Sequence, residues 1–249
     1  MGRELEIKTP VRRIVSLVPS QTEFLYHLGL DAEVVGITKF CVHPKEWFRN
    51  KTRVGGTKNA KYSRVAELKP DLIIGNKEEN DQTNIDELKD LAPIWMSDIK
   101  TLKDAFDMMI ELGKIVGKEE QAKIMVEQIQ GEFDRLALQP KKSALYFIWK
   151  DPWMLAGTDT FISDMLQKCG FKNRASGSRY PLLDEVNVEI DVILLSSEPY
   201  PFKEQDLNEM QLKFPNAKVL LVDGEMFSWY GSRLLKAPDY FQQLLTSIG

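Results

Sequence analysis

The chain has 249 residues, a formal net charge of −4 at pH 7 and 43% hydrophobic residues, which is typical of a globular protein with one large domain or two lobes. The acidic balance argues against a nucleic-acid-binding protein, because such proteins usually carry a basic patch or stripe. No apolar run approaches the ~20 residues that cross a bilayer, so we expect no membrane insertion. Cys41 and Cys169 stand far apart without C-x-x-C spacing, which indicates neither a zinc site nor a disulfide framework.

The first hundred residues alternate short apolar runs with helical patterns. Ser20 stands where a helix N-cap is expected, and Glu23 follows three residues later, as in a capping box. Strands that alternate with helices predict a parallel α/β sheet. The strands that we expect in this part of the chain are residues 13–19, 34–40, 72–75 and 93–98.

Residues 101–138 form one long helical pattern that contains no proline. A single helix of ~35 residues would reach ~50 Å at 1.5 Å per residue. Gly113 and Gly117 can break or bend such a helix, because glycine costs ~1 kcal/mol relative to alanine in a helix. The pattern fits either two packed helices or a single backbone helix that connects two lobes, and we expect the single helix.

The second half repeats the first in outline. We expect strands at residues 144–149, 192–196 and 217–223, a helix at 161–169 and a last helix from Gly231 or Ser232 to the C-terminus. The segment LKPDLIIGN matches VEIDVILLSS, and LAPIWMSD matches FPNAKVLLVD. The sequence therefore predicts an N-terminal α/β lobe (1–100), a linking helix (101–138) and a C-terminal α/β lobe (139–249). In open α/β sheets ligands bind beyond the carboxyl ends of the strands, so we expect the ligand site there.

Several segments resemble the cobalamin-type substrate-binding proteins of ABC transporters, which belong to the helical-backbone (class III) group that also binds ferric siderophores and haem. These segments are RIVSLVPSQTE, VVGITKFCVHP, RVGGTKN, VAELKPDLIIGNKEEN and FSWYGSR, and together they span nearly the whole chain. FCVHP and EMFSWYGSR resemble the branch described as helical backbone metal receptors. The resemblance implies two Rossmann-like lobes with parallel sheets, a long backbone helix between them, and one ligand in a shallow cleft.

The chain departs from the cobalamin binders at His43, where they carry an aromatic residue. An imidazole there can donate a hydrogen bond to the ligand or act as an axial ligand to its metal, since haem iron is often bound by histidine. Alternatively, His43 holds its own loop. A second departure is Met226, where cobalamin binders tend to have tryptophan, and Trp229 can supply an aromatic face instead.

We therefore expect a binding protein, not an enzyme, that buries a flat metal complex between aromatic faces without a catalytic cofactor. Each aromatic side chain can bury 150–250 Å², so a few of them suffice for tight capture. The expected ligand is a cobalamin or other corrinoid, and the alternative is haem or a ferric siderophore. Aromatic residues at strand ends also often cap the sheet core. The expected ligand contacts are Ser20, Gln21, Phe40, Cys41, His43, Trp47, Trp153, Tyr200, Trp229, Tyr230 and Arg233.

The resemblance also implies that one exposed acid on each lobe docks on an ABC transporter permease dimer. The candidates are Glu78 or Glu79 in the first lobe and Glu198 or Glu204 in the second. Exposed glutamates usually only solvate a surface, and an exposed ion pair contributes ~0–1 kcal/mol, so such contacts orient docking more than they tighten it. We expect the protein itself to be a monomer.

Three other classes of protein remain as alternatives. A zinc or manganese carrier needs three or four ligands, and His27 and His43 are too few. Cys41 and His43 suggest a nucleophile and a base, but no orienting residue accompanies them. A cytoplasmic carrier or sensor is the third class, because the start MGRELEIKTP has no signal-peptide core. We expect a cytoplasmic protein if this is the native start, and a periplasmic or extracellular, membrane-attached protein if a leader was removed.

Overall fold

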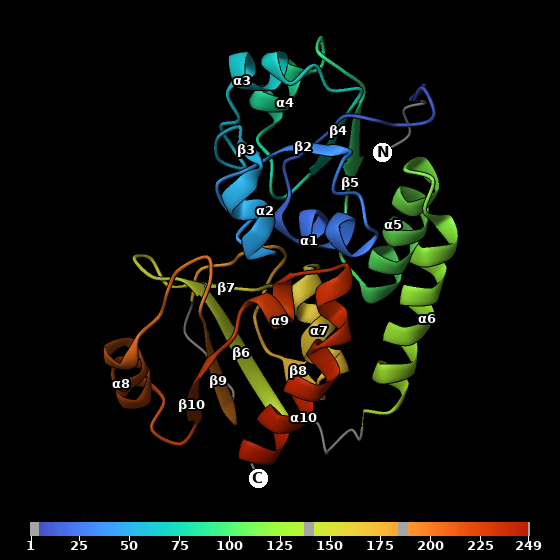
Figure 1. The fold of residues 1–249 in the computed structure, drawn as a ribbon. Coiled ribbons are helices and arrows are strands. Elements are labelled where there is room, and N and C mark those ends of the chain that lie inside the picture. The colour runs from blue at the N-terminus through green and yellow to red at the C-terminus, as the bar shows by residue number, and fades with distance from the viewer. Residues whose placement is uncertain (1–4, 137–141, 184–188, 249) are drawn as a thin grey trace. The chain divides into compact units, whose positions relative to one another are not determined.

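The computed structural model, which describes residues 5–136, 142–183 and 189–248, divides into two compact units (Figure 1). Unit 1 consists of Met1–Ile99, Lys103–Gln128 and Tyr230–Arg233, and unit 2 consists of Lys100–Leu102, Ile129–Trp229 and Leu234–Gly249. The chain thus passes from one unit to the other several times. The division predicted from the sequence, into residues 1–100, 101–138 and 139–249, did not include these passages between the units.

Unit 1 is built on a parallel sheet of five strands in the order β3-β2-β1-β4-β5. The apolar runs form strands because they are buried on both faces of the sheet, and Ile14, Val15 and Ile73 are fully buried. The sequence did not indicate β3, whose two residues are too few for a period. The strands are β1 (Ile14–Ser16), β2 (Val34–Ile37), β3 (Thr52–Arg53), β4 (Leu72–Asn76) and β5 (Ile94–Ser97).

The first helix of unit 1 starts differently from the prediction. Val18 is the N-cap and Pro19 is the first helical residue, so the expected capping box of Ser20 and Glu23 is wrong. Proline suits this position because its fixed φ fits the helix and its missing N–H would have no partner there. The shorter helices of this unit are α1 (Pro19–His27), α2 (Lys45–Asn50), α3 (Tyr62–Glu67) and α4 (Gln82–Leu88).

The long helical pattern forms two helices, α5 (Leu102–Ile115) and α6 (Glu119–Asp134), which lie side by side in Figure 1. The expected single backbone helix is therefore wrong, and the two-helix interpretation is correct. Gly117 ends the first helix with φ +71°, a conformation that glycine adopts without strain. A Cβ at Gly113 would lie 2.5 Å from the Ala122 Cβ, so glycine permits the close packing of α5 on α6. The last two residues of the predicted linking helix, 137 and 138, lie outside the described residues.

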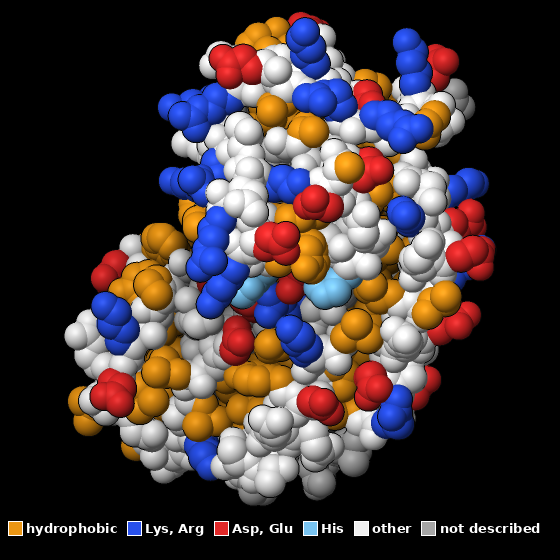
Figure 2. All heavy atoms as spheres, viewed as in Figure 1, with side chains coloured by type: hydrophobic (Ala, Val, Ile, Leu, Met, Phe, Trp, Pro, Cys, Tyr) orange, Lys and Arg blue, Asp and Glu red, His pale blue; other side chains and the backbone are white. Residues whose placement is uncertain are grey.

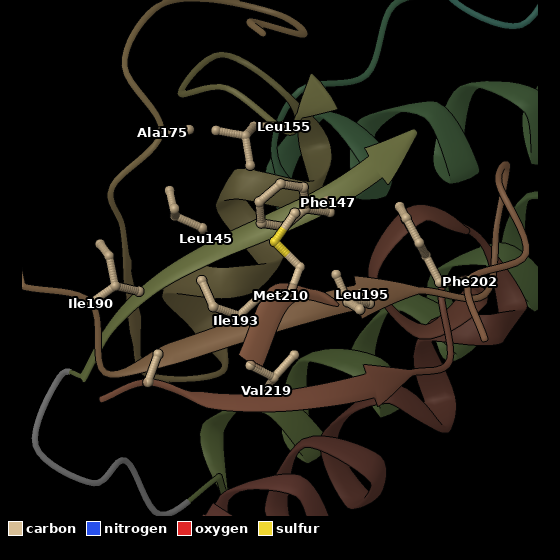
Figure 3. Close-up of a cluster of buried hydrophobic side chains, with 11 residues drawn as sticks. Leu145, Phe147, Leu155, Ala175, Ile190, Ile193, Leu195, Phe202, Met210 and Val219 are labelled. Carbon is tan, nitrogen blue, oxygen red and sulfur yellow. The ribbon is translucent and has the colours of Figure 1, made fainter. Parts of the chain in front are cut away.

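Unit 2 contains a second sheet, in the order β10-β9-β6-β7, with β8 paired to β6. All pairs are parallel except β6 with β7, which is antiparallel. One face of this sheet carries a core of Leu145, Phe147, Ile193 and Leu195, on which Met210 of α8 packs (Figure 3). The strands are β6 (Lys142–Trp149), β7 (Met154–Leu155), β8 (Phe171–Asn173), β9 (Val192–Ser196) and β10 (Lys218–Val222).

The helices of unit 2 follow the prediction in part. Helix α7 begins after Thr160, whose hydroxyl accepts a hydrogen bond from the Ser163 N–H at 3.2 Å. The last helix begins later than expected, because a 3₁₀ turn at Ser232–Leu235 precedes it. These helices are α7 (Phe161–Lys168), α8 (Glu204–Lys213), α9 (Glu225–Ser228) and α10 (Ala237–Ile248). Within the described ranges, we find no helix with the length and apolar character needed to span a bilayer.

The contact between Gly113 and Ala122 gives a prediction for stability. We expect Gly113→Ala to lower the free energy of unfolding by ~1–2 kcal/mol, because overpacking costs ~1–3 kcal/mol and exceeds the gain in helix propensity. The matched control is Gly131→Ala in α6, where the nearest atom lies 3.9 Å from the new Cβ. This control should gain up to ~1 kcal/mol in urea unfolding. Equal effects of the two changes would contradict the proposed close packing.

Candidate functional site

In unit 1, hydrogen bonds join the carboxyl ends of β4 and β5 to the start of α1. The Gln21 amide donates to the Ser97 hydroxyl at 2.6 Å, and the Asn76 amide donates to the same hydroxyl at 3.0 Å. Gln21 is fully buried and its Oε1 has no hydrogen-bond partner among the described groups. A buried acceptor without a partner costs ~1–3 kcal/mol, so a ligand or water that donates to Oε1 would be stabilised there. Ser20, beside it, is also buried, with 5% exposure.

Cys41 turns into the interior of unit 1 and is a correction to the expected ligand contacts. Its side chain is fully buried, and its Sγ lies 3.2 Å from the hydroxyls of both Thr22 and Thr38. Burial raises the pKa of the Cys41 thiol. A nucleophilic cysteine needs a lowered pKa to form the thiolate. This environment therefore also argues against Cys41 as a nucleophile with His43 as its base.

Trp47 is a second correction, because it is 1% exposed and belongs to the core. Its indole N–H donates to the Asp31 carboxylate at 2.7 Å, and its ring packs edge-on against Tyr26 at 5.3 Å. Lys51 forms an ion pair with Asp31 at 3.0 Å and lowers the pKa of that carboxyl. Trp47 therefore anchors α2, the helix that follows the FCVHP segment, to the core of unit 1.

The FCVHP segment exposes two apolar side chains, Phe40 at 50% and Val42 at 39%. His43 beside them is half-buried. The segment rests on the RVGGTKN loop, since a Cβ at Gly56 would lie 3.4 Å from the Phe40 ring. The Lys39 N–H also donates to the Gly55 carbonyl at 2.7 Å. The structure thus brings together two motifs that the sequence separates.

In unit 2, Glu198 fixes the indole of Trp229. The Glu198 Oε1 accepts hydrogen bonds from Trp229 Nε1 at 2.8 Å and from the Ser228 hydroxyl at 2.6 Å. Gly224 allows this approach, because a Cβ there would lie 2.7 Å from the Glu198 Cγ and 2.4 Å from the Ser196 hydroxyl. The sequence did not predict this cluster, whose residues belong to two segments, SSEP and DGEMFSW, that each follow a strand of unit 2.

Burial raises the pKa of Glu198, and the nearby Glu225 and Asp223 raise it further, against the two hydrogen bonds. A half-buried carboxylate that already accepts two hydrogen bonds is poorly placed to meet an arginine from another protein. Glu198 is thus a correction to the docking candidates. Glu204, the first residue of α8, is exposed.

Glu78 and Glu79, the candidates in unit 1, follow β4 on a turn held by Asn76. Their backbone N–H groups donate to the Asn76 side-chain oxygen at 2.8 and 3.3 Å. Glu79 is exposed and Glu78 is half-buried. The turn therefore presents Glu79 more fully to solvent than Glu78.

The remaining predicted aromatics of unit 2 form a ladder near the ends of β6 and β9. Trp153 stacks on Phe202 at 5.7 Å with an interplanar angle of 2°, and Tyr200 lies 4.7 Å from Phe202. Trp153 and Tyr200 are both half-buried. The Lys150 ammonium lies 5.0 Å from the centre of the Trp153 ring. Each aromatic contact of this kind adds ~0.5–1.5 kcal/mol beyond area burial, so these rings hold one another in place.

Arg233 forms a buried ion pair in unit 1. Its guanidinium donates two hydrogen bonds to the Glu23 carboxylate, at 2.9 Å from Nε and 2.8 Å from Nη2. The two side chains are only 7% and 8% exposed. The structure therefore gives Arg233 a structural role that the sequence did not predict. Tyr230, in the same segment, is 6% exposed, and Trp229 in unit 2 is 7% exposed.

Across the described part of the chain, no group of three or more His, Cys, Asp or Glu is arranged to hold a metal ion.

A family model described as "Periplasmic binding protein" matches residues 14–198, which is more than half of the chain. The chain belongs to this family. Its fold is that of the class III, helical-backbone substrate-binding proteins, as the resemblance implied. Fold class and family are thus confirmed.

Two relatives illustrate the range of the periplasmic binding protein family. The chain is 30% identical, over 187 residues and 70% of its length, to an uncharacterized ABC transporter substrate-binding lipoprotein of Bacillus subtilis (strain 168), of which the match spans 59%. It is 27% identical to a vitamin B12-binding protein of Pectobacterium carotovorum subsp. carotovorum (strain PC1), a match that covers 95% of this chain and 89% of the relative.

Solved structures of the same fold include the periplasmic vitamin B12 binding protein of Vibrio cholerae, with TM-score 0.78, 21% identity, and coverage of 96% of this chain and 98% of that one. The periplasmic heme binding protein of the same organism has TM-score 0.77, 20% identity, and coverage of 94% and 98%. At these identities the likeness supports the fold alone.

The raised pKa of Glu198 gives a prediction for the pH dependence of stability. The folded protein binds the Glu198 carboxyl proton more tightly than the unfolded chain does. The contribution of Glu198 to stability therefore falls as pH rises from the ordinary carboxyl pKa through the raised pKa. Glu198→Gln keeps an acceptor oxygen but cannot ionise. We therefore expect the variant to gain stability over the wild type between mildly acidic and neutral pH, measured by urea unfolding.

The control for this prediction is Glu204→Gln, which removes an exposed charge in the same unit. Its stability difference from the wild type should change little with pH. If the stability difference between Glu198→Gln and the wild type also changes little with pH, the half-buried environment described for this carboxyl would be contradicted.

Proposed function

We propose that the protein is the substrate-binding component of an ABC importer and captures a cobalamin or other corrinoid without chemical change. The observation that carries the proposal is the exposed surface of Phe40 and Val42 after β2, with half-buried His43 beside them, where α/β sheets bind ligands. The Pectobacterium relative, which aligns over 95% of this chain, is named as a vitamin B12-binding protein. Both observations support a large, flat and partly apolar ligand.

Unit 2 by itself also holds aromatic rings in fixed positions before any ligand arrives. The Trp229 indole is held by Glu198, and Trp153 and Tyr200 are held by Phe202. Fixing such rings in the free protein lowers the entropy lost on binding. Burial of the apolar surface of a corrin ring against Phe40 and Val42 in unit 1 contributes ~25 cal/mol per Å².

Haem or a ferric siderophore is the second candidate ligand. His43 favours it, because histidine is a common axial ligand of haem iron. Among the structures of the same fold, some are named as heme-binding proteins, which makes this ligand compatible with the fold. The ligand is substrate in either case, and the protein supplies only binding and orientation.

The partner and location follow from the same proposal. The Bacillus relative is named as a lipoprotein of an ABC transporter, which supports a periplasmic or extracellular, membrane-attached protein that docks on a permease dimer. A cytoplasmic carrier or sensor is the alternative from another class. Fractionation of the native host distinguishes the two locations.

Titration of the intact protein with cyanocobalamin, cobinamide, haemin and a ferric siderophore tests the ligand class. We expect His43→Ala to weaken binding of the true ligand at least ~10-fold and to shift its corrin or Soret band, because an axial or polar contact is lost. The control is His27→Ala, since His27 is exposed and its ring contacts the Glu23 carbonyl and the Tyr26 ring of its own helix. Unchanged affinity and spectrum for His43→Ala would return His43 to a loop-holding role.

Charge reversal tests docking. We expect Glu79→Lys with Glu204→Lys to reduce uptake of the ligand by cells while binding by the purified protein persists, because exposed acids steer the encounter with a basic permease surface. Glu78→Lys, on the same turn as Glu79, is measured separately. The control is Glu67→Lys with Glu189→Lys, which changes net charge equally at exposed positions before β4 and β9. Normal uptake by the Glu79/Glu204 variant would refute the docking assignment.

A further inference from the structure

Positive charge is concentrated in one short part of unit 1. Between Lys39 and Lys61 the sequence contains seven lysine or arginine residues and one acid, Glu46, although the whole chain has a net charge of −4. This segment includes α2 and β3, and β3 is the edge strand of the sheet. Figure 2 shows basic side chains gathered over the part of the surface that carries these elements.

Some of these cations have structural partners. Lys51 pairs with Asp31, and the Arg53 guanidinium donates to the Phe48 carbonyl and lies 5.1 Å from the Phe48 ring. Lys39 and Lys58 are both exposed, and each lies in the loop that follows the carboxyl end of a strand, β2 for Lys39 and β3 for Lys58. These two lysines therefore belong to the edge of the sheet at which α/β proteins bind ligands.

The two loops that carry Lys39 and Lys58 are held together. Phe40 lies against Gly56, and the Asn80 amide donates to the Thr57 carbonyl at 2.7 Å, which fixes the residue before Lys58. The Lys39 ammonium lies 4.9 Å from the centre of the Phe40 ring. The result is an exposed apolar patch, Phe40 and Val42, with the Lys39 ammonium beside it and Lys58 on the adjoining loop. We call Lys39 and Lys58 the basic rim.

We propose that the basic rim binds the carboxylate groups of an anionic, planar metal complex, while Phe40 and Val42 contact its ring system. This inference rests on the proposed function and names the charge of the ligand that the function leaves open. A neutral corrinoid, whose side chains are amides, gains only the apolar contact. A complex with carboxylates gains charge-assisted hydrogen bonds as well, which are about twice as strong as neutral ones.

Matched pairs of ligands isolate the carboxylate. One pair is haemin and haemin dimethyl ester, and the other is cyanocobalamin and its monocarboxylic acid, in which one side-chain amide is hydrolysed. We expect the intact protein to bind the acid of the productive pair ~3–10-fold more tightly than the neutral partner, with a difference that shrinks as salt is raised. The pair that binds identifies whether the carboxylates belong to a porphyrin or to a corrin.

Charge reversal locates the effect. Lys39→Glu with Lys58→Glu should abolish the preference for the acid and weaken its binding at least ~10-fold, while the neutral ligand binds as before. The matched control is Arg12→Glu with Lys89→Glu, which changes the net charge equally at exposed positions before β1 and β5, at the amino ends of these strands. Lys39→Gln with Lys58→Gln keeps the residues polar in case the reversed variant does not fold.

The outcomes separate this inference from the proposed function. Binding of the acid and the neutral ligand with equal affinity, or an equal loss in the control variant, would overturn the basic rim and leave capture of a metal complex intact. No binding of any of the four ligands, nor of cobinamide or the ferric siderophore, would overturn the proposed function itself. A preference for the acid that survives in the Lys39/Lys58 variant would also overturn the inference.

Discussion

The buried ion pair of Glu23 and Arg233 is the interaction on which the arrangement of unit 1 depends. It joins residues 210 positions apart and brings the segment Tyr230–Arg233 onto α1. Removing two charges from water costs several kcal/mol for each ion, which only good geometry and further hydrogen bonds recover. The two parallel hydrogen bonds from the guanidinium to the carboxylate provide this geometry. Loss of one partner would leave a buried charge, so the pair fixes where the chain goes directly after Trp229.

In both units, close backbone contacts and side-chain hydrogen bonds fix the loops that follow the strands. In unit 1 the Asn80 Oδ1 accepts a hydrogen bond from the Asn76 N–H at 2.7 Å, and the Asn80 amide donates to the Thr57 carbonyl. One residue thus links the loops after β3 and β4. In unit 2 Gly224 leaves room for Ser196 and Glu198. Loops that are held in this way present their side chains in one arrangement, and a ligand then loses less conformational entropy on binding.

The sequence predicted the strands well because a buried parallel strand is a short apolar run, and β9 has the predicted bounds of Val192–Ser196. It predicted less about which strand-end residues are exposed. Cys41 and Phe40 are neighbours after the same strand, yet one is fully buried and the other is 50% exposed. Position along the chain cannot decide this, because the direction of each side chain depends on Thr22 and on Gly56, which belong to other segments.

The errors in the helices and in the roles of single residues have similar physical causes. Gly117 allowed either a bend or a break, and the sequence did not show that α6 packs against α5 at Gly113 after the φ of +71° at Gly117. Glu198 was read as a surface acid because the sequence gives no sign that the Trp229 N–H lies within hydrogen-bond distance. Glu23 matched a capping box locally, but its partner comes from the far end of the chain. Contacts between distant segments decided each case.

The return of Tyr230–Arg233 to unit 1 has a consequence for dissecting the protein. A fragment that ends after Gln128 would contain every strand of the first sheet, yet its Glu23 would have lost the guanidinium that neutralises it. Expression of the N-terminal half alone is therefore a poor route to an autonomous domain. A circular permutant that opens the chain elsewhere would keep this tail and its anchor together.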